Sequence, residues 1–283
     1  MQEQIKAIIL GIVQGLTEFL PISSTAHLRI VPAVFHWNDP GTAFSAVIQL
    51  GTMFAVVIYF RKDLLEIYGA LFSDLVLFCR GGVTPLQTHD SKIAAWILLA
   101  TIPICIFGLL FKDPIEAGMV RNLNLISSYL IFFGILLFVS EIFAKESKTL
   151  ADINMLDVLL IGLIQSFALI PGVSRSGVTL FSGLLLGFKR AQAARFSFLL
   201  SVPAVLISGV LELQTLCINI TRGQENIIWT NLVIGVLAAY ISGYFTIDFI
   251  LKYLQTHKTH VFVVYRILLG VLVIYLNYRH IIH

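Results

Sequence analysis

The sequence predicts an all-α polytopic membrane protein, in which six transmembrane helices and two re-entrant helical hairpins form an inverted-topology repeat. Three observations support this fold class. Of the 283 residues, 58% are hydrophobic and only 12% are charged, which is about half the charged fraction of a typical soluble domain. Six apolar stretches approach the length of a membrane span, and two further apolar regions are interrupted by a proline and a serine cluster. We therefore expect a single integral membrane domain over residues 1–283.

The six predicted spans follow from the thickness of the bilayer. A hydrocarbon core of about 30 Å requires about 20 apolar residues in a helix. Apolar stretches of approximately this length occupy residues 41–60, 93–111, 123–140, 196–211, 227–247 and 261–278. The fourth is short unless it includes residues 191–195. The sixth contains Arg266, which we interpret as an end residue that extends its charge toward the membrane surface.

The two interrupted regions are residues 5–32, broken at Pro21, and residues 155–188, broken at Pro171. Proline cannot donate a backbone hydrogen bond and disfavours helix at the residue before it. Each region should therefore form two helices that are too short to cross the membrane comfortably. We predict two re-entrant hairpins with tips at the middle of the membrane, where non-helical backbone must be buried by protein or line a wet cavity.

The two interrupted regions also resemble each other. Gly11-Ile-Val-Gln14 matches Gly162-Leu-Ile-Gln165, and Ser23 matches Ser174 at the same spacing. This pattern indicates an internal duplication, with repeats at about residues 1–145 and 150–283. Each repeat holds one hairpin and three spans. Because three is odd, the second copy enters the membrane upside down, which is the plan of many transporters with sites near the midplane.

The distribution of Lys and Arg predicts the orientation. If both termini share one side, the opposite side collects most basic residues near span ends: Arg61, Lys62, Arg80, Lys92, Lys145, Lys148, Lys189, Arg190, Lys252 and Lys258. The positive-inside rule places that side in the cytoplasm. The first hairpin and both termini should then face the periplasm or exterior.

The first hairpin tip carries hydroxyl groups and an imidazole directly after Pro21, at Ser23, Ser24, Thr25 and His27. Hydroxyl side chains cap the start of a helix, and a helix N-terminus attracts anions. Ser24 and His27 are three residues apart and share a helix face. A neutral imidazole can accept a hydroxyl proton or attack phosphorus itself. We take Ser24 as the nucleophile and His27 as its base, with His27 or an activated water as the alternative nucleophiles.

The helix that leads into this tip carries Gln14 and Glu18, four residues apart and therefore on one face. Mg²⁺ and Ca²⁺ prefer hard oxygen ligands such as carboxylate, carbonyl and phosphate oxygens. We expect a divalent cation, Mg²⁺ or Ca²⁺, at Glu18 and Gln14. Since two ligands make a thin shell, substrate oxygens and water would have to complete it.

The second hairpin tip carries the motif Pro171-Gly-Val-Ser-Arg-Ser-Gly177. Gly172 and Gly177 permit tight turns and a close approach of the backbone to a ligand. Ser174 and Ser176 add hydrogen-bond donors. The planar guanidinium of Arg175 suits two phosphate oxygens, so this motif predicts a phosphate-binding site.

Arg175 and Glu18 both lie inside apolar regions, where a charged side chain is costly and normally faces a partner or a cavity. Their matching places at the two tips predict that they pair within one shared polar site. The alternative is a purely structural ion pair. Gln49, Thr52 and Gln165 are also polar; they could line the cavity, but we favour helix–helix hydrogen bonding for them.

The two motifs, at residues 14–27 and 171–177, resemble the signature motifs of the undecaprenyl-diphosphate phosphatases, also called bacitracin-resistance proteins. The resemblance extends to Ile48-Gln-Leu-Gly51 and to the segment that begins at Arg195, and so covers nearly the whole chain. It implies a hydrolase of the bacterial inner membrane that converts undecaprenyl diphosphate to undecaprenyl phosphate and phosphate, and so recycles the lipid carrier for peptidoglycan synthesis. It also implies a divalent cation and a site that faces the periplasm.

At matching positions, Gln14 and Glu18 correspond to the glutamate-or-glutamine pair of the family's first motif. Ser174 and Arg175 correspond to the residues of its second motif that hold phosphate. The implied partners are a polyprenyl diphosphate and membrane lipids; no basic run suggests nucleic acid, and a homodimer is left open. A polyprenyl-phosphate transporter or flippase is the alternative function, because inverted repeats and broken helices are transporter features. Transport does not require a serine paired with a histidine, and this favours the phosphatase.

Overall fold

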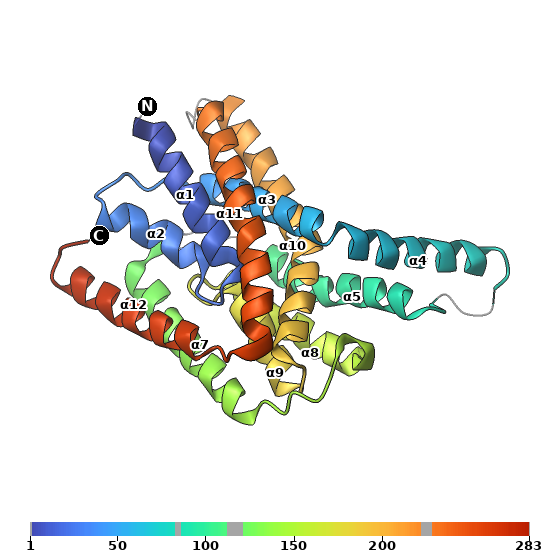
Figure 1. Ribbon diagram of the computed structural model, residues 1–283. Helices are drawn as coiled ribbons and strands as arrows, with labels where there is room; N and C mark the ends of the chain where they lie inside the picture. Colours follow the sequence, from blue (N-terminus) through green and yellow to red (C-terminus); the bar gives the residue numbers. More distant parts are fainter. Residues whose placement is uncertain (1, 83–85, 112–120, 222–227, 283) are drawn as a thin grey trace.

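The structure is a computed structural model that describes residues 2–82, 86–111, 121–221 and 228–282. These residues form α-helices joined by short connections, without a β-strand among them (Figure 1). The α-helices are α1 (Gln2–Phe19), α2 (Ser24–Val34), α3 (Gly41–Tyr59), α4 (Arg61–Cys79), α5 (His89–Leu110), α7 (Leu123–Phe143), α8 (Met155–Gln165), α9 (Arg175–Leu185), α10 (Arg190–Thr221), α11 (Trp229–Thr256) and α12 (His260–Tyr278). Two short 3₁₀ helices, η2 (Leu150–Asp152) and η3 (Ser166–Leu169), flank α8.

The predicted spans coincide with α3, α5, α7, α10, α11 and α12. Among the described residues, five of these helices are long and apolar enough to cross a membrane, and a sixth span is added if α3 and α4 count as one bent span. Large apolar side chains are exposed along the outer faces, for example Leu237 on α11 and Leu268 on α12. Such faces suit lipid rather than water, and the chain is a polytopic membrane protein as expected.

Helix α4 was not expected from the sequence. The structure continues from α3 into α4 with a bend of 78° between Ala43–Tyr59 and Arg61–Cys79. In Figure 1, α4 packs alongside α5 and the two extend away from the other helices. The Asp74 carboxylate accepts the backbone N–H groups of Gln87 and Thr88, at 2.8 and 3.1 Å, and so fixes the start of α5. Charged residues in the first two turns of α4 interrupt its apolar sequence, so the sequence does not predict a membrane span there.

The two expected hairpins are present as α1–α2 and α8–α9, with breaks at Pro21 and Pro171. Helices α2, α8 and α9 have 11 residues each, so each rises about 16 Å, roughly half of a bilayer core. Helix α1 is longer, at 18 residues. These short helices agree with re-entrant hairpins.

The two hairpin tips share one backbone geometry. Ser23 precedes α2 with φ 75° and ψ 100°, and Ser174 precedes α9 with φ 74° and ψ 111°. Each serine caps its helix by accepting a backbone N–H three residues later, from Ala26 and Gly177 respectively. Two non-glycine residues in this rare region mark a local geometry that the surrounding contacts maintain. The division into repeats at residues 1–145 and 150–283 stays a prediction.

Each hairpin is attached to a span through a glycine. A Cβ atom on Gly11 of α1 would lie 2.4 Å from the carbonyl oxygen of Gly235 on α11. A Cβ atom on Gly162 of α8 would lie 2.7 Å from the carbonyl oxygen of Ala100 on α5. Only glycine permits backbones to approach this closely, so matching residues of the two hairpins set equivalent helix contacts.

Candidate active site

The two hairpin tips meet at an ion pair. Glu18 is near the C-terminus of α1, and Arg175 is the first residue of α9. The Arg175 guanidinium donates a hydrogen bond to Glu18 Oε1, and the side chains are 13% and 3% exposed. The Ser176 hydroxyl donates to the Leu20 carbonyl oxygen at 3.1 Å. The structure therefore places the two polar tips in one site, as their matching positions predict.

The Glu18 carboxylate is the centre of this site. Its Oε1 atom accepts hydrogen bonds from Arg175 and from Gln49 Nε2 on α3, the latter at 3.0 Å. Its Oε2 atom accepts from Gln14 Nε2 at 2.9 Å and from Ser24 Oγ at 2.6 Å. Four donors fill the roughly four acceptor positions of an ionised carboxylate. Gln49, for which helix–helix hydrogen bonding was favoured over a place in the cavity, is therefore part of the site.

The arrangement at Glu18 does not fit a resident divalent cation. Because a carboxylate only accepts hydrogen bonds, the Gln14 amide turns its nitrogen, not its oxygen, toward Glu18. A cation at Glu18 would have to displace one of its four donors and would lie beside the Arg175 charge. Within the described ranges, no group of three or more His, Cys, Asp or Glu side chains converges on a possible cation site. The geometry supports no reaction step through a cation held by Gln14 and Glu18.

Ser24 and His27 share a helix face but have different partners. The half-buried Ser24 hydroxyl donates to Glu18 Oε2. His27 Nδ1 lies 2.7 Å from the Ser23 carbonyl oxygen, and its Nε2 lies 2.7 Å from the Tyr265 hydroxyl. None of these contacts joins Ser24 to His27, and the expected role of His27 as the base stays a prediction. The Ser23 carbonyl oxygen also accepts the backbone N–H of His27 at 3.3 Å, whereas Ser24 faces the end of α1.

Each hairpin tip also forms the start of a helix. Helix geometry leaves the first N–H groups of a helix without an intrahelical acceptor, and the serine caps satisfy those of Ala26 and Gly177. The remaining first-turn donors are those of Ser24, Thr25, Arg175 and Ser176. The first residues of α2 and α9, Ser24 and Arg175, both contact the Glu18 carboxylate, and helix N-termini attract anions.

Gly172 and Gly177 closely approach protein atoms, and their expected approach to a ligand stays a prediction. Gly172 has φ +88°, and a Cβ atom there would lie 2.3 Å from the Ile126 carbonyl oxygen on α7. A Cβ atom on Gly177 would lie 2.9 Å from Nη1 of Arg266 on α12. The Gly177 N–H is already used by the Ser174 cap. These glycines shape the tip by letting other helices come close to it.

Arg266 is fully buried, at 0% exposure. The interpretation that it extends its charge toward the membrane surface is therefore wrong. Its guanidinium donates to the Pro21 carbonyl oxygen of the first tip at 3.0 Å. It also donates to Gly172 and Val173 of the second tip, at 3.1 and 3.0 Å, and to Leu130 of α7 at 3.1 Å. One side chain therefore joins both hairpin tips to a span. The only sequence signal for this role is a charge in the middle of an apolar stretch.

Comparison with known proteins identifies the family. The family model described as bacitracin resistance protein BacA matches residues 7–272. The chain belongs to this family. It is 50% identical over 272 residues to the undecaprenyl-diphosphatase of Myxococcus xanthus strain DK1622, a match that covers 96% of this chain and 88% of the relative. The undecaprenyl-diphosphatases of Prosthecochloris aestuarii and Chlorobium chlorochromatii are each 48% identical over 276 residues, with 95% of both chains covered.

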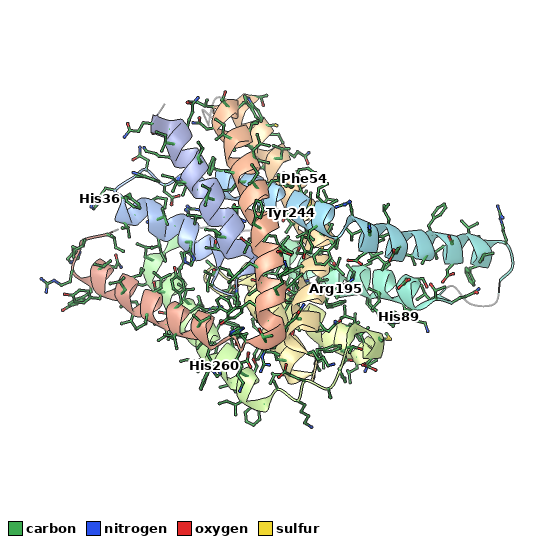
Figure 2. The ribbon with its side chains drawn as sticks, in the orientation of Figure 1. His36, Phe54, His89, Arg195, Tyr244 and His260 are labelled. Carbon is green, nitrogen blue, oxygen red and sulfur yellow. The ribbon has the colours of Figure 1, made fainter. Side chains whose placement is uncertain are left out.

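The region matched by the bacitracin resistance family contains the whole site, from Gln14 to Arg266, and both hairpins apart from the first residues of α1. Three other histidines lie near helix ends (Figure 2): His89 and His260 begin α5 and α12, and His36 follows α2.

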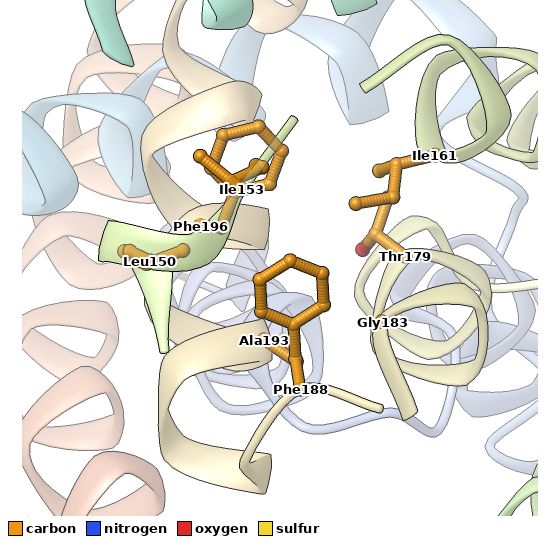
Figure 3. Close-up of a pocket in the computed structure, with 8 residues that line it drawn as sticks. All are labelled: Leu150, Ile153, Ile161, Thr179, Gly183, Phe188, Ala193 and Phe196. Atoms are coloured by element: carbon orange, nitrogen blue, oxygen red, sulfur yellow. The ribbon is translucent and has the colours of Figure 1, made fainter. Parts of the chain in front are cut away.

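A separate pocket lies between η2, α8, α9 and the start of α10 (Figure 3). Its lining residues are Leu150, Ile153, Ile161, Thr179, Gly183, Phe188, Ala193 and Phe196. The Thr179 hydroxyl donates to the Arg175 carbonyl oxygen at 2.8 Å. A lining without charged side chains is unsuited to a phosphate, so this pocket is distinct from the site at the hairpin tips.

Proposed function

We propose that this chain is an undecaprenyl-diphosphate phosphatase, a hydrolase that removes the terminal phosphate from undecaprenyl diphosphate. The product, undecaprenyl phosphate, is the lipid carrier that cell-wall synthesis reuses. The observation that carries this proposal is the hydrogen bond from Ser24 Oγ to Glu18 Oε2, beside Arg175 and two helix N-termini. Membership of the bacitracin resistance family and the names of the relatives support the same activity.

Arg175 and the free first-turn amides bind the terminal phosphate. A guanidinium has five N–H donors in a planar fork, and Arg175 uses one on Glu18 and one, at 3.4 Å, on the Ser201 carbonyl oxygen. The remaining donors are available to phosphate oxygens while the ion pair with Glu18 persists. The N–H groups at the start of α2 and α9 add donors from both sides, and phosphoryl transfer depends mainly on such positioning and charge stabilisation.

Ser24 is the nucleophile and Glu18 is its base. The Ser24 hydroxyl already donates to Glu18 at 2.6 Å, within the reach required of a general base. Ser24 Oγ attacks the terminal phosphorus, its proton passes to Glu18, and the bond to the bridging oxygen breaks to release undecaprenyl phosphate. Water then attacks the phosphoserine, which releases inorganic phosphate and restores Ser24. His27, the base expected from sequence, is hydrogen-bonded elsewhere.

No step of this reaction is assigned to a cation held by Gln14 and Glu18. The Mg²⁺ or Ca²⁺ expected from the resemblance is proposed to enter on the diphosphate, whose oxygens are the hard ligands that such cations prefer. This arrangement leaves the four hydrogen bonds of Glu18 in place.

The proposed location is the bacterial inner membrane, with the site open to the periplasm and both termini on that side. The concentration of Lys and Arg on the opposite side supports this orientation. The polyprenyl chain of the substrate would remain in lipid, next to the apolar outer faces of the helices.

Phosphate release from undecaprenyl diphosphate by the purified protein in detergent tests the proposal. We expect release by the unmodified protein and its loss in Ser24→Ala, while Ser128→Ala, which changes an exposed serine of α7, retains it. In a parallel vesicle assay, movement of the lipid between leaflets without phosphate release would favour the transporter instead.

A further inference from the structure

Tyr265 of α12 lies against the His27 ring. The two rings are stacked, with centroids 5.6 Å apart and an interplanar angle of 7°. The Tyr265 hydroxyl is 2.7 Å from His27 Nε2. Neither motif at the hairpin tips contains Tyr265, and no role was assigned to it above.

The hydrogen bonds define the form of the imidazole. The Ser23 carbonyl oxygen can only accept, so His27 Nδ1 carries the proton in that contact. A neutral imidazole then accepts at Nε2, and the Tyr265 hydroxyl is the donor there. Two consecutive hydrogen bonds therefore connect the Tyr265 hydroxyl, through the His27 ring, to the Ser23 carbonyl oxygen.

These hydrogen bonds end at Ser23, whose backbone conformation is unusual. Ser23 has φ 75°, a region that L-amino acids rarely adopt, and it directly precedes the nucleophile Ser24. The equivalent residue of the second tip, Ser174, has φ 74°, but the side chain four residues later is Val178, which has no donor. Between these two tips, only the one that carries Ser24 has a histidine on the strained carbonyl, and Tyr265 holds that histidine.

We propose that Tyr265 is a positioning residue for phosphoryl transfer. Its hydroxyl orients His27, His27 holds the Ser23 carbonyl, and this fixes the direction of the Ser24 hydroxyl and of the first N–H groups of α2. The proposal rests on the proposed function of Ser24. It explains how a histidine that does not contact Ser24 contributes to the reaction.

Tyr265→Phe is the direct test, because phenylalanine keeps the stacked ring and removes only the hydroxyl. We expect kcat to fall about tenfold with KM nearly unchanged, since a misplacement of about 1 Å can cost about a hundredfold in rate. Tyr275→Phe, on the same helix and 52% exposed, is the matched control and should retain full activity. Wild-type kcat in Tyr265→Phe would overturn the proposal.

Two further measurements separate positioning from a general structural effect. In ¹⁵N-histidine NMR spectra, with the His27 signals assigned by their loss in His27→Gln, Tyr265→Phe should shift Nε2 and leave Nδ1 protonated. An unchanged Nε2 signal would contradict the hydrogen bond. The double variant should be no slower than His27→Gln alone, and additive losses would overturn action through His27. If the unmodified protein released no phosphate, the proposed function would fail, while the NMR result would still report on Tyr265.

Discussion

The Arg175 guanidinium donates a hydrogen bond to the Glu18 carboxylate across 157 positions of sequence, and this contact joins the tips of two hairpins. Both side chains are largely buried. A buried ion pair adds little net stability compared with an apolar pair, but removal of one partner leaves an uncompensated charge. The charge on each tip therefore needs the opposite charge on the other tip. The pair also places the positive Arg175 guanidinium directly beside the proposed base.

Arg175→Ala should abolish phosphate release while the protein still inserts and folds. The substitution removes the proposed phosphate clamp and leaves the Glu18 charge with only neutral donors, at a cost in stability of about 3–5 kcal/mol. Phosphate release and thermal unfolding in detergent measure the two effects separately. Near-normal turnover would contradict the site, whereas lower stability alone would match a purely structural ion pair.

Glu18→Gln should reduce phosphate release at least a hundredfold, because an amide cannot accept the Ser24 proton as a base. The amide would also turn N–H donors toward side chains that are themselves donors at Glu18: Gln14, Ser24, Gln49 and Arg175. If single-turnover experiments on this variant still gave fast formation of phosphoserine, Glu18 would not be the base.

Arg266→Lys should destabilise the fold even though lysine keeps the positive charge. A lysine ammonium has three donors on one atom, and it cannot reproduce a planar fork that reaches four carbonyl oxygens on three segments. Each buried carbonyl left without its donor costs about 1–3 kcal/mol. Thermal unfolding measured by fluorescence-detected size exclusion should show a markedly lower midpoint. A midpoint equal to that of the unmodified protein would show that the four contacts are dispensable.

Gly172→Ala should be strongly destabilising. A Cβ atom there would lie 2.3 Å from the Ile126 carbonyl oxygen, and φ is +88°, which an L-residue adopts only with strain of order 1–3 kcal/mol. The matched control is Gly69→Ala in α4, where a Cβ atom would meet nothing within 4 Å. The control should be neutral or more stable by about 0.5–1 kcal/mol, because alanine favours helix. Equal unfolding midpoints for the two variants would contradict the close approach at Gly172.

Mg²⁺ and Ca²⁺ should bind weakly to the protein alone, because all four acceptor positions of Glu18 are used. Isothermal titration calorimetry should detect no site tighter than about millimolar without diphosphate, and tighter binding once a diphosphate lipid is present. A micromolar site in the lipid-free protein, lost in Glu18→Gln, would show that Glu18 and Gln14 hold a resident cation after all.

Much of this protein can be predicted from its sequence, because the bilayer imposes local rules. Apolar length predicts the spans, and a proline beside a serine cluster predicts each break, since both depend on neighbouring residues alone. The pairing of Glu18 with Arg175 was also predictable, because a charge at each of two matching tips requires a partner. Helix α4 escaped prediction because the charges in its first turns interrupt an otherwise apolar pattern.

The partners within the site were decided by the tertiary structure alone. Ser24 and His27 are three residues apart, yet the Ser24 hydroxyl turns to Glu18, and His27 binds Tyr265, 238 positions away. Arg266 reaches Pro21 over 245 positions. A shared helix face only places side chains near one another. The hydrogen-bond partner of each side chain is set by helices from distant parts of the chain. A local sequence pattern cannot predict how those helices pack together.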